Sequence, residues 1–224
     1  MSRRHKPHLR CPDCRLHRSL CICALLPRLE TRTRVVLIVH QLEATKPTNT
    51  GLLAARCLVN SAVVFRGRTP DGREGAPVDE VPLLTGEPLM LFPHPTATPL
   101  DEWRGSGGPV TLIVPDGTWA QASSTRRRTP ALRGIPCVSL PAPAVEAGRL
   151  RRPTRPGRLA TLEALATALG ILEGPAVRDA LMYVYRVMTD RTLWSNGRLP
   201  TEAVTGGIPP GVASHDPLRP PRAT

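Results

Sequence analysis

Aromatic side chains are scarce in this 224-residue chain and make up only 3% of it. Proteins that read the bases of single-stranded RNA on an open β-sheet need several aromatic rings for stacking. The composition therefore argues against a sequence-reading platform of that kind. If the chain binds nucleic acid, contacts with the backbone and with the shape of the molecule are favoured.

Long apolar runs are also missing. The longest ones, such as Val35 to Val39 and Val110 to Val114, are far shorter than the roughly 20 residues that a membrane-spanning helix requires. The basic N-terminus leads into cysteines and not into an apolar run, so no secretory signal is predicted. We therefore expect a cytoplasmic protein with no membrane contact.

Acidic residues are few, with 18 Asp and Glu against 30 Lys and Arg, which gives a net charge of +12. This excess favours a polyanionic partner, because phosphates neutralised by Arg or Lys release condensed counterions. A GC-rich genome also produces arginine-rich chains, so the total charge alone is ambiguous. Its distribution is more informative, since solvated surface normally mixes both signs. Two groups without acidic residues predict RNA-binding sites: Arg126, Arg127, Arg128 and Arg133, and Arg149, Arg151, Arg152, Arg155 and Arg158.

From Arg34 onward, short β-branched runs alternate with helical stretches, which is typical of an α/β fold with a mostly parallel sheet and flanking helices. Strands are predicted at residues 34–40, 61–65, 88–92, 109–115 and 135–140. Helices are predicted at residues 49–59, 118–128, 159–172 and 175–189. We divide the chain into a basic zinc-binding lobe at 1–30, an α/β catalytic domain at 31–205 and a proline-rich tail at 206–224, which is expected to be disordered.

Four of the six cysteines lie close together in the N-terminal segment, as Cys11-x2-Cys14-x6-Cys21-x-Cys23. Four thiolates at this spacing suit tetrahedral Zn²⁺ in a structural site with no open coordination position, and His17 is an alternative ligand. Disulfides are the rival interpretation, but they are disfavoured in a cytoplasmic protein. Cys57 and Cys137 lie in apolar surroundings and are expected to be ordinary buried thiols.

Polar residues follow two of the predicted strands. His40 ends the first strand and Glu43 and Asn49 follow it, while Asp116-Gly117-Thr118-Trp119 comes after strand 109–115. Each residue has an ordinary explanation as a helix cap, a turn or part of the core. In an open α/β sheet, however, both segments reach the carboxyl edge, where ligands bind. A carboxylate, a hydroxyl and an indole together offer an amine anchor or base, a hydrogen-bonding group and a flat apolar wall.

The order of four motifs resembles that of the DTW-domain proteins, the tRNA-uridine aminocarboxypropyltransferases. The motifs are the cysteine pattern, Asn49-Thr50-Gly51, Asp116-x-Thr118-Trp119, and the stretch from Leu150-Arg151 to Leu159-Ala160-Thr161-Leu162-Glu163-Ala164. The resemblance covers about residues 11 to 195. It implies a fold related to the SPOUT methyltransferases, whose chains are knotted. It also implies transfer of the 3-amino-3-carboxypropyl group of S-adenosylmethionine (SAM) to N3 of a tRNA uridine.

In such a reaction the γ-carbon of the SAM methionine chain is held in line with uridine N3, and 5′-methylthioadenosine leaves. Asp116 is then either the general base for the uridine imide or the anchor of the SAM α-amino group. Thr118 orients a polar end of the ligand, and Trp119 forms a flat apolar side of the pocket. Further SAM contacts are expected from Leu112, Ile113, Val114, Pro115, Gly117, Leu150, Leu159, Thr161 and Glu163. The expected partner is tRNA, the expected cofactors are SAM and structural zinc, and the protein is expected to be a monomer or homodimer.

The residues alone do not exclude two other functions. A SPOUT-like RNA methyltransferase would use SAM but release S-adenosylhomocysteine. A non-catalytic zinc-containing RNA-binding module would bind RNA and not SAM. A pure binder has no need for an Asp-Thr-Trp group at a strand end, so the pattern favours an enzyme.

Overall fold

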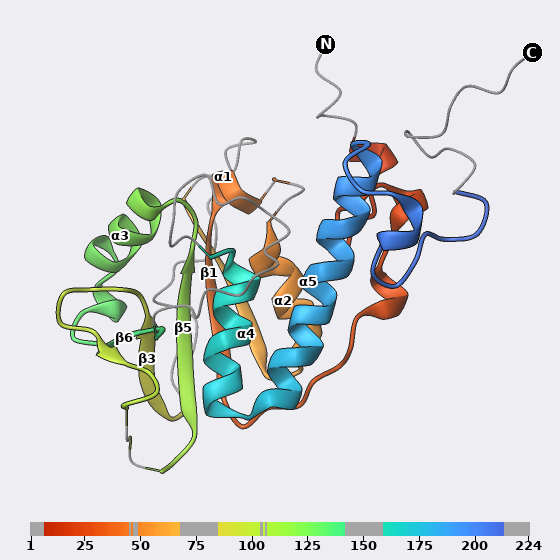
Figure 1. Ribbon diagram of the computed structural model, residues 1–224. Coiled ribbons are helices and arrows are strands. Elements are labelled where there is room, and N and C mark those ends of the chain that lie inside the picture. Colours follow the sequence, from red (N-terminus) through yellow and green to blue (C-terminus); the bar gives the residue numbers. More distant parts are fainter. Residues whose placement is uncertain are drawn as a thin grey trace, which may run out of the picture.

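A computed structural model describes residues 7–44, 46, 49–67, 85–103, 105, 107–141 and 159–212 of the chain. At its centre is a six-stranded sheet in the order β2-β1-β5-β3-β6-β4, in which every strand pair is parallel. Helices flank this sheet (Figure 1). The predicted α/β class is therefore confirmed.

The boundaries of the elements follow the apolar pattern closely. The strands are β1 Arg34–His40, β2 Ser61–Arg66, β3 Glu87–Leu91, β4 Thr98–Pro99, β5 Val110–Asp116 and β6 Cys137–Ser139. The helices are α1 Gln41–Ala44, α2 Thr50–Cys57, α3 Trp119–Arg128, α4 Thr161–Leu172 and α5 Pro175–Ser195. All nine predicted elements are present, although α5 continues to Ser195 and does not end at residue 189. The sequence did not predict α1 and β4, because elements this short have no periodicity to detect.

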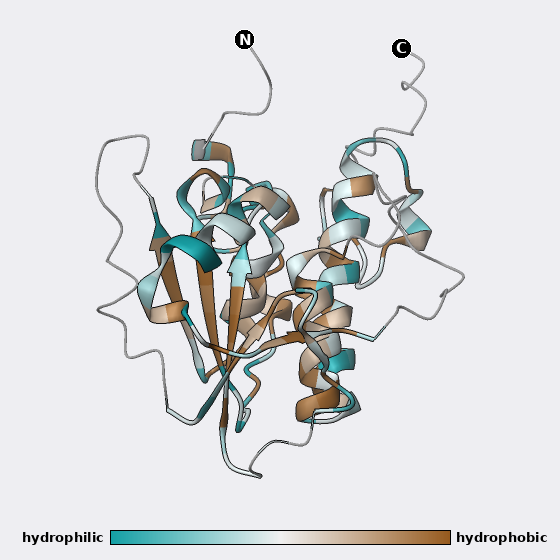
Figure 2. Cartoon of the chain, turned by 90° about the vertical axis from the view of Figure 1, so that its left-hand side faces the viewer, coloured by the Kyte–Doolittle hydropathy of each residue, from teal (hydrophilic) through white to brown (hydrophobic). Residues whose placement is uncertain are grey.

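The two faces of the sheet are covered by different helices. Val35, Leu37 and Val39 of β1 belong to one hydrophobic core, which they share with α2, α4 and α5. Val36 and Ile38 face the other side, where they share a core with α3. Side chains alternate between the faces of a strand, so a strand that is buried on both faces is apolar throughout. Figure 2 shows the strands mostly in the brown of hydrophobic residues, whereas the helices carry both colours.

The N-terminal segment packs on the main body of the protein. Cys11, Cys14, Leu16 and Ile22 are buried in the same core as α2, α4 and α5. The predicted zinc lobe and the α/β domain therefore share apolar contacts. In Figure 1 the N-terminal segment lies beside the end of α5.

The start of the expected proline-rich tail also packs on this region. Ile208 and Val212 contact a small cluster formed by Leu20, Trp194 and Val204. Residues 213–224 lie outside the described residues, as do 68–84 and 142–158. None of the helices in the described ranges is both long enough and apolar enough to span a bilayer.

Candidate functional site

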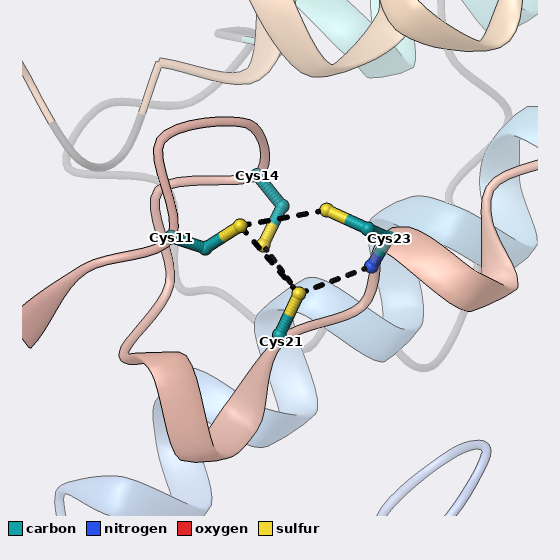
Figure 3. A group of neighbouring side chains, drawn as sticks. All are labelled: Cys11, Cys14, Cys21 and Cys23. Carbon is teal, nitrogen blue, oxygen red and sulfur yellow. Dashed lines mark hydrogen bonds between the residues drawn. The ribbon is translucent and has the colours of Figure 1, made fainter.

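The four N-terminal cysteines gather into one cluster (Figure 3). Their sulfur atoms all lie within 4.8 Å of one another. The Cys11 Sγ lies 3.6 Å from the Sγ atoms of Cys21 and Cys23, and the Cys14 Sγ lies 3.7 Å from that of Cys21. Four sulfurs placed tetrahedrally at about 2.3 Å from one Zn²⁺ would be about 3.8 Å apart. The cluster therefore fits a metal ion, and all six cysteines of the chain are free thiols.

A tight turn brings Cys11 and Cys14 together. Arg15 adopts a left-handed backbone conformation with φ of 62°, and its N–H donates to the Cys11 carbonyl at 3.0 Å. His17 lies outside the sulfur cluster, where its Nδ1 pairs with the Ser19 hydroxyl at 2.7 Å. The four cysteines alone could thus supply four ligands to a metal ion, without His17.

The other two cysteines are buried, as predicted. The Cys57 thiol donates to the Leu53 carbonyl, with an Sγ to oxygen distance of 3.4 Å, and burial raises its pKa to about 12. Cys137 lies in the core on the α3 side of the sheet. Both thiols are therefore packing groups, in contrast to the N-terminal cluster.

A second polar site surrounds Asp116, the last residue of β5. The Asn49 side-chain amide donates to one carboxylate oxygen at 2.6 Å, and the Thr161 hydroxyl donates to the other at 2.5 Å. Asn49 immediately precedes α2, and Thr161 is the first residue of α4. One carboxylate, only 7% exposed, therefore joins the ends of three elements that are far apart in the sequence.

Local hydrogen bonds fix the two helix ends that meet at Asp116. The Asn49 Oδ1 caps α2 by accepting from the Leu52 N–H at 2.8 Å. Next to it, the Thr50 hydroxyl accepts from the Leu162 N–H of α4 at 3.3 Å. These contacts satisfy N–H groups that have no partner within their own helix. The starts of α2 and α4 are thus held against each other as well as against β5.

Gly51 permits this close approach. A Cβ atom at this position would lie 3.1 Å from the Asp116 Cγ and 3.1 Å from the Leu37 Cδ2. Those distances are shorter than ordinary van der Waals contact. The glycine of Asn49-Thr50-Gly51 is therefore explained by the space that Asp116 occupies.

The electrostatic environment of Asp116 combines opposing effects. Burial raises the pKa of its carboxyl, while the hydrogen bonds from Thr161 and Asn49 act in the opposite direction. Burial is the largest of these effects. Both oxygens already accept a hydrogen bond, so the group is well suited to holding its neighbours in place.

Thr118 and Trp119 follow Asp116 at the start of α3. The Thr118 hydroxyl accepts from the Gln121 N–H at 3.3 Å, and the Gln121 side chain accepts from the Thr118 N–H at 2.6 Å. This pair is a capping box. Trp119 is 53% exposed and stacks on Phe92, with 5.2 Å between ring centroids and 21° between planes. Its ring thus offers a flat apolar surface to solvent, and Phe92 behind it was not singled out from the sequence.

His40 and Arg66 extend the site along the neighbouring strands. The His40 Nδ1 accepts from the Leu42 N–H at 3.2 Å and lies 3.3 Å from the Gln121 side-chain nitrogen. Burial lowers the pKa of His40, and the charge of Arg66 lowers it further. Arg66 donates to the Thr125 hydroxyl at 3.4 Å. The segments after β1 and β5 therefore meet at one sheet edge, as the order of the motifs predicted, and Arg66 is an addition that the sequence did not indicate.

The expected SAM-contacting residues of β5 are mostly core residues. Leu112 and Ile113 are fully buried and Val114 is 3% exposed. Pro115 is half-buried and Gly117 is exposed. Because the side chains of the first three point into the two cores, a ligand at the strand end would contact Pro115, Gly117 and backbone atoms.

On the C-terminal side, Leu159 and Glu163 lie at the start of α4. The Glu163 carboxylate accepts from the Ala160 N–H at 2.8 Å and so caps this helix. Leu159 is half-buried. Leu150, Arg151, Arg152 and Arg155 lie outside the described residues, so their contacts with SAM and tRNA stay predictions.

The arginines at the end of α3 form a basic surface. Arg127 and Arg128 are exposed, and Arg126 is half-buried. Arg128 lies near enough to Arg66 for its charge to lower the pKa of that guanidinium. Within the described part of the chain, none of the three α3 arginines pairs with a carboxylate. Unpaired positive charge on a helix end suits an anionic ligand.

Comparison with known proteins supports one family. The DTW domain model matches residues 8–193. The chain is 32% identical over 178 residues to tRNA-uridine aminocarboxypropyltransferase 2 of Drosophila melanogaster. The matched region covers 77% of this chain and 70% of that protein. It is 30% identical to the proteins of the same name from Macaca fascicularis and Mus musculus, covering 73% of this chain and 56% of each relative. No solved structure matches the chain.

Proposed function

Because the chain belongs to the DTW domain family, we propose that it is a tRNA-uridine aminocarboxypropyltransferase that uses SAM and modifies N3 of a tRNA uridine. The observation that carries this proposal is the Asp116 carboxylate. It joins the motif segments of Asn49, Asp116 and Thr161 at the carboxyl edge of a parallel sheet, where ligands of α/β proteins bind.

The proposed reaction is a single displacement. Uridine N3 loses its proton and forms a bond to the γ-carbon of the SAM methionine chain, while the bond from that carbon to sulfur breaks. The sulfonium becomes the neutral thioether of 5′-methylthioadenosine, and the proton passes to a base or to solvent. The site must therefore hold the methionine chain extended, with its γ-carbon and not its methyl group facing the base.

Of the two roles considered for Asp116, we favour the anchor. Its two oxygens already accept from Asn49 and Thr161, and a carboxylate with about four acceptor positions can take a further donor from the SAM α-amino group. A general base would need an oxygen free to face uridine N3. The raised pKa of Asp116 would suit a base, but it follows from the burial that also separates the carboxyl from a large substrate.

Trp119 and Thr118 have different proposed tasks. Trp119, stacked on Phe92, supplies the flat wall of the pocket. Thr118 fixes the start of α3, and thereby the position of Trp119. Pro115, Gly117, Leu159 and the backbone of β5 complete the SAM site.

Arginines would bind the tRNA through its phosphates. Arg126, Arg127 and Arg128 supply the described part of this surface, and Arg151, Arg152 and Arg155 are proposed to extend it. Contacts of this kind position an RNA without reading its sequence. The N-terminal cysteine segment would also contact the sugar-phosphate backbone of the tRNA.

We propose that the four cysteines hold one structural Zn²⁺. Four thiolates close the coordination sphere, so the ion would cross-link the segment from Cys11 to Cys23 and take no part in group transfer. The cytoplasmic location of the protein and its state as a monomer or homodimer stay predictions.

Incubation of the protein with tRNA and SAM, followed by mass spectrometry, tests the proposal. The expected products are an aminocarboxypropyl-modified uridine and 5′-methylthioadenosine in equal amounts. S-adenosylhomocysteine with a methylated nucleoside would identify a methyltransferase instead. RNA binding without SAM binding in calorimetry would identify a non-catalytic module.

A further inference from the structure

Arg191 of α5 is a buried cation that bridges two distant segments. It is 4% exposed. One terminal nitrogen donates to the carbonyls of Leu20 at 3.3 Å and Cys21 at 2.7 Å. The Nε donates to the Gly207 carbonyl at 3.1 Å, and the other terminal nitrogen donates to the Gly206 carbonyl at 3.5 Å. The guanidinium thus holds the cysteine segment and the C-terminal segment at once.

These carbonyl groups satisfy the N–H donors of Arg191 but carry no net negative charge. In the ranges that the structure describes, no carboxylate pairs with Arg191. The carboxylate of the adjacent Asp190 accepts from the Thr205 N–H at 3.0 Å. A buried charge without a counter-charge is strongly destabilising. Besides the buried Asp190 carboxylate, a further negatively charged group nearby would therefore stabilise Arg191.

The cysteine cluster can supply such charge. Arg191 contacts the backbone of Cys21, which is one of the four clustered residues. Four thiolates around one divalent ion carry a net charge of about −2.

We propose that Arg191 is the counter-ion of the metal-bound cysteine cluster, so that metal binding and the docking of the segment from Gly206 to Val212 on α5 are coupled. The geometry supports this, because the same guanidinium contacts both partners. The C-terminal segment has further contacts of its own, since Ile208 and Val212 pack against Leu20 and Trp194. The inference rests on the proposed zinc site and is independent of the transferase activity.

The metal affinity of full-length variants shows whether Arg191 acts through its charge, as a counter-ion, or only through its hydrogen bonds. Arg191→Lys keeps the charge and loses the planar set of donors, whereas Arg191→Gln keeps donors and loses the charge. Arg186→Gln is the matched control, because Arg186 is exposed on the same helix. Zinc content by mass spectrometry and zinc affinity in competition with a chromogenic chelator are the readouts.

We expect Arg191→Gln to bind zinc at least tenfold more weakly than Arg191→Lys, and Arg186→Gln to bind it like the unaltered protein. Equal zinc affinities of the Lys and Gln variants would overturn the proposal. An unaltered protein that binds no zinc would overturn the zinc site itself, whether or not the protein transfers aminocarboxypropyl groups.

Hydrogen exchange of the unaltered protein gives a second test that needs no variant to fold. The amides of Thr205, Gly207 and Val212 donate within the C-terminal segment or to Asp190. Removing the metal with a chelator should accelerate their exchange at least tenfold, while the amides of β1 stay protected. Unchanged exchange at residues 204–212 would overturn the coupling.

Discussion

Gly51→Ala tests whether the fit between α2 and Asp116 controls activity. The added methyl group would lie 3.1 Å from the Asp116 Cγ and 3.2 Å from its Oδ2. One of the two must move by a few tenths of an ångström. That shift would disturb the 2.6 Å hydrogen bond from Asn49 to the carboxylate. The substitution removes no polar group, so any loss of activity must come from altered positions.

The expected effect on stability is small. Alanine is favoured over glycine within a helix by about 0.8–1 kcal/mol. Overpacking of a well-filled site costs about 1–3 kcal/mol. The net loss is therefore about 1 kcal/mol, which corresponds to a fall in Tm of about 2–4 °C for a domain of this size.

The expected effect on activity is larger. A misplacement of 1 Å can cost about a hundredfold in rate, so a shift of a few tenths of an ångström should lower kcat/KM for SAM about tenfold. That factor corresponds to about 1.4 kcal/mol of transition-state stabilisation. The assay is release of 5′-methylthioadenosine from SAM and tRNA at a temperature well below the Tm of the variant.

Gly170→Ala is the control. Its methyl group would lie 2.9 Å from the Arg178 Cβ, so it crowds the packing of α4 on α5 away from Asp116. We expect this variant to lose at least as much stability as Gly51→Ala and to keep its turnover. Normal turnover of Gly51→Ala, or an equal loss in both variants, would refute the reasoning.

Three further predictions concern the same site and the proposed RNA-binding surface. Asp116→Asn should abolish transfer and destabilise the protein by about 1.5–3 kcal/mol, because the amide keeps one acceptor oxygen and loses the other, and a hydrogen bond to a charged group contributes about that much; full activity in this variant would remove Asp116 from the site. Arg151→Ala or Arg127→Ala should weaken tRNA binding and reduce the slope of log K against log salt by about 1, whereas the exposed Arg178, which pairs with Asp179, should give an unchanged slope when replaced by Ala. The lowered pKa of His40 means that the unfolded chain binds its proton more readily, so stability should fall as the pH drops below about 6.5. His40→Gln should flatten that fall in urea titrations between pH 5 and pH 7, and an unchanged profile would assign the effect to other groups.

The sequence predicted the elements well because the local pattern determines them. β1 and β5 are buried on both faces, which produces continuous apolar runs, and the start of α3 carries its own capping box. The cysteine cluster was predictable from spacing alone, since the four cysteines lie within one short segment. These features depend on interactions between near neighbours in the chain.

Features that depend on strand order were predicted only in part. Parallel strands bring Asn49 and Asp116 to one edge, but only the pairing of β1 with β5 brings them into contact. Nothing in the sequence places Phe92 behind Trp119, because β3 reaches that position through its pairing with β5. Arg191 was missed for a similar reason, since arginines on helices are usually exposed and its burial depends on two segments at opposite ends of the chain.

The hydrogen bonds of Asp116 also bear on the order of folding. Its partners lie 67 residues earlier and 45 residues later in the chain. Contacts between such distant residues form late, because the intervening chain must first be ordered. During synthesis α4 leaves the ribosome after the whole sheet, so a nascent chain could assemble its sheet but not the hydrogen bonds around Asp116. Binding of the proposed small-molecule substrate would then occur only after α4 has packed on the sheet.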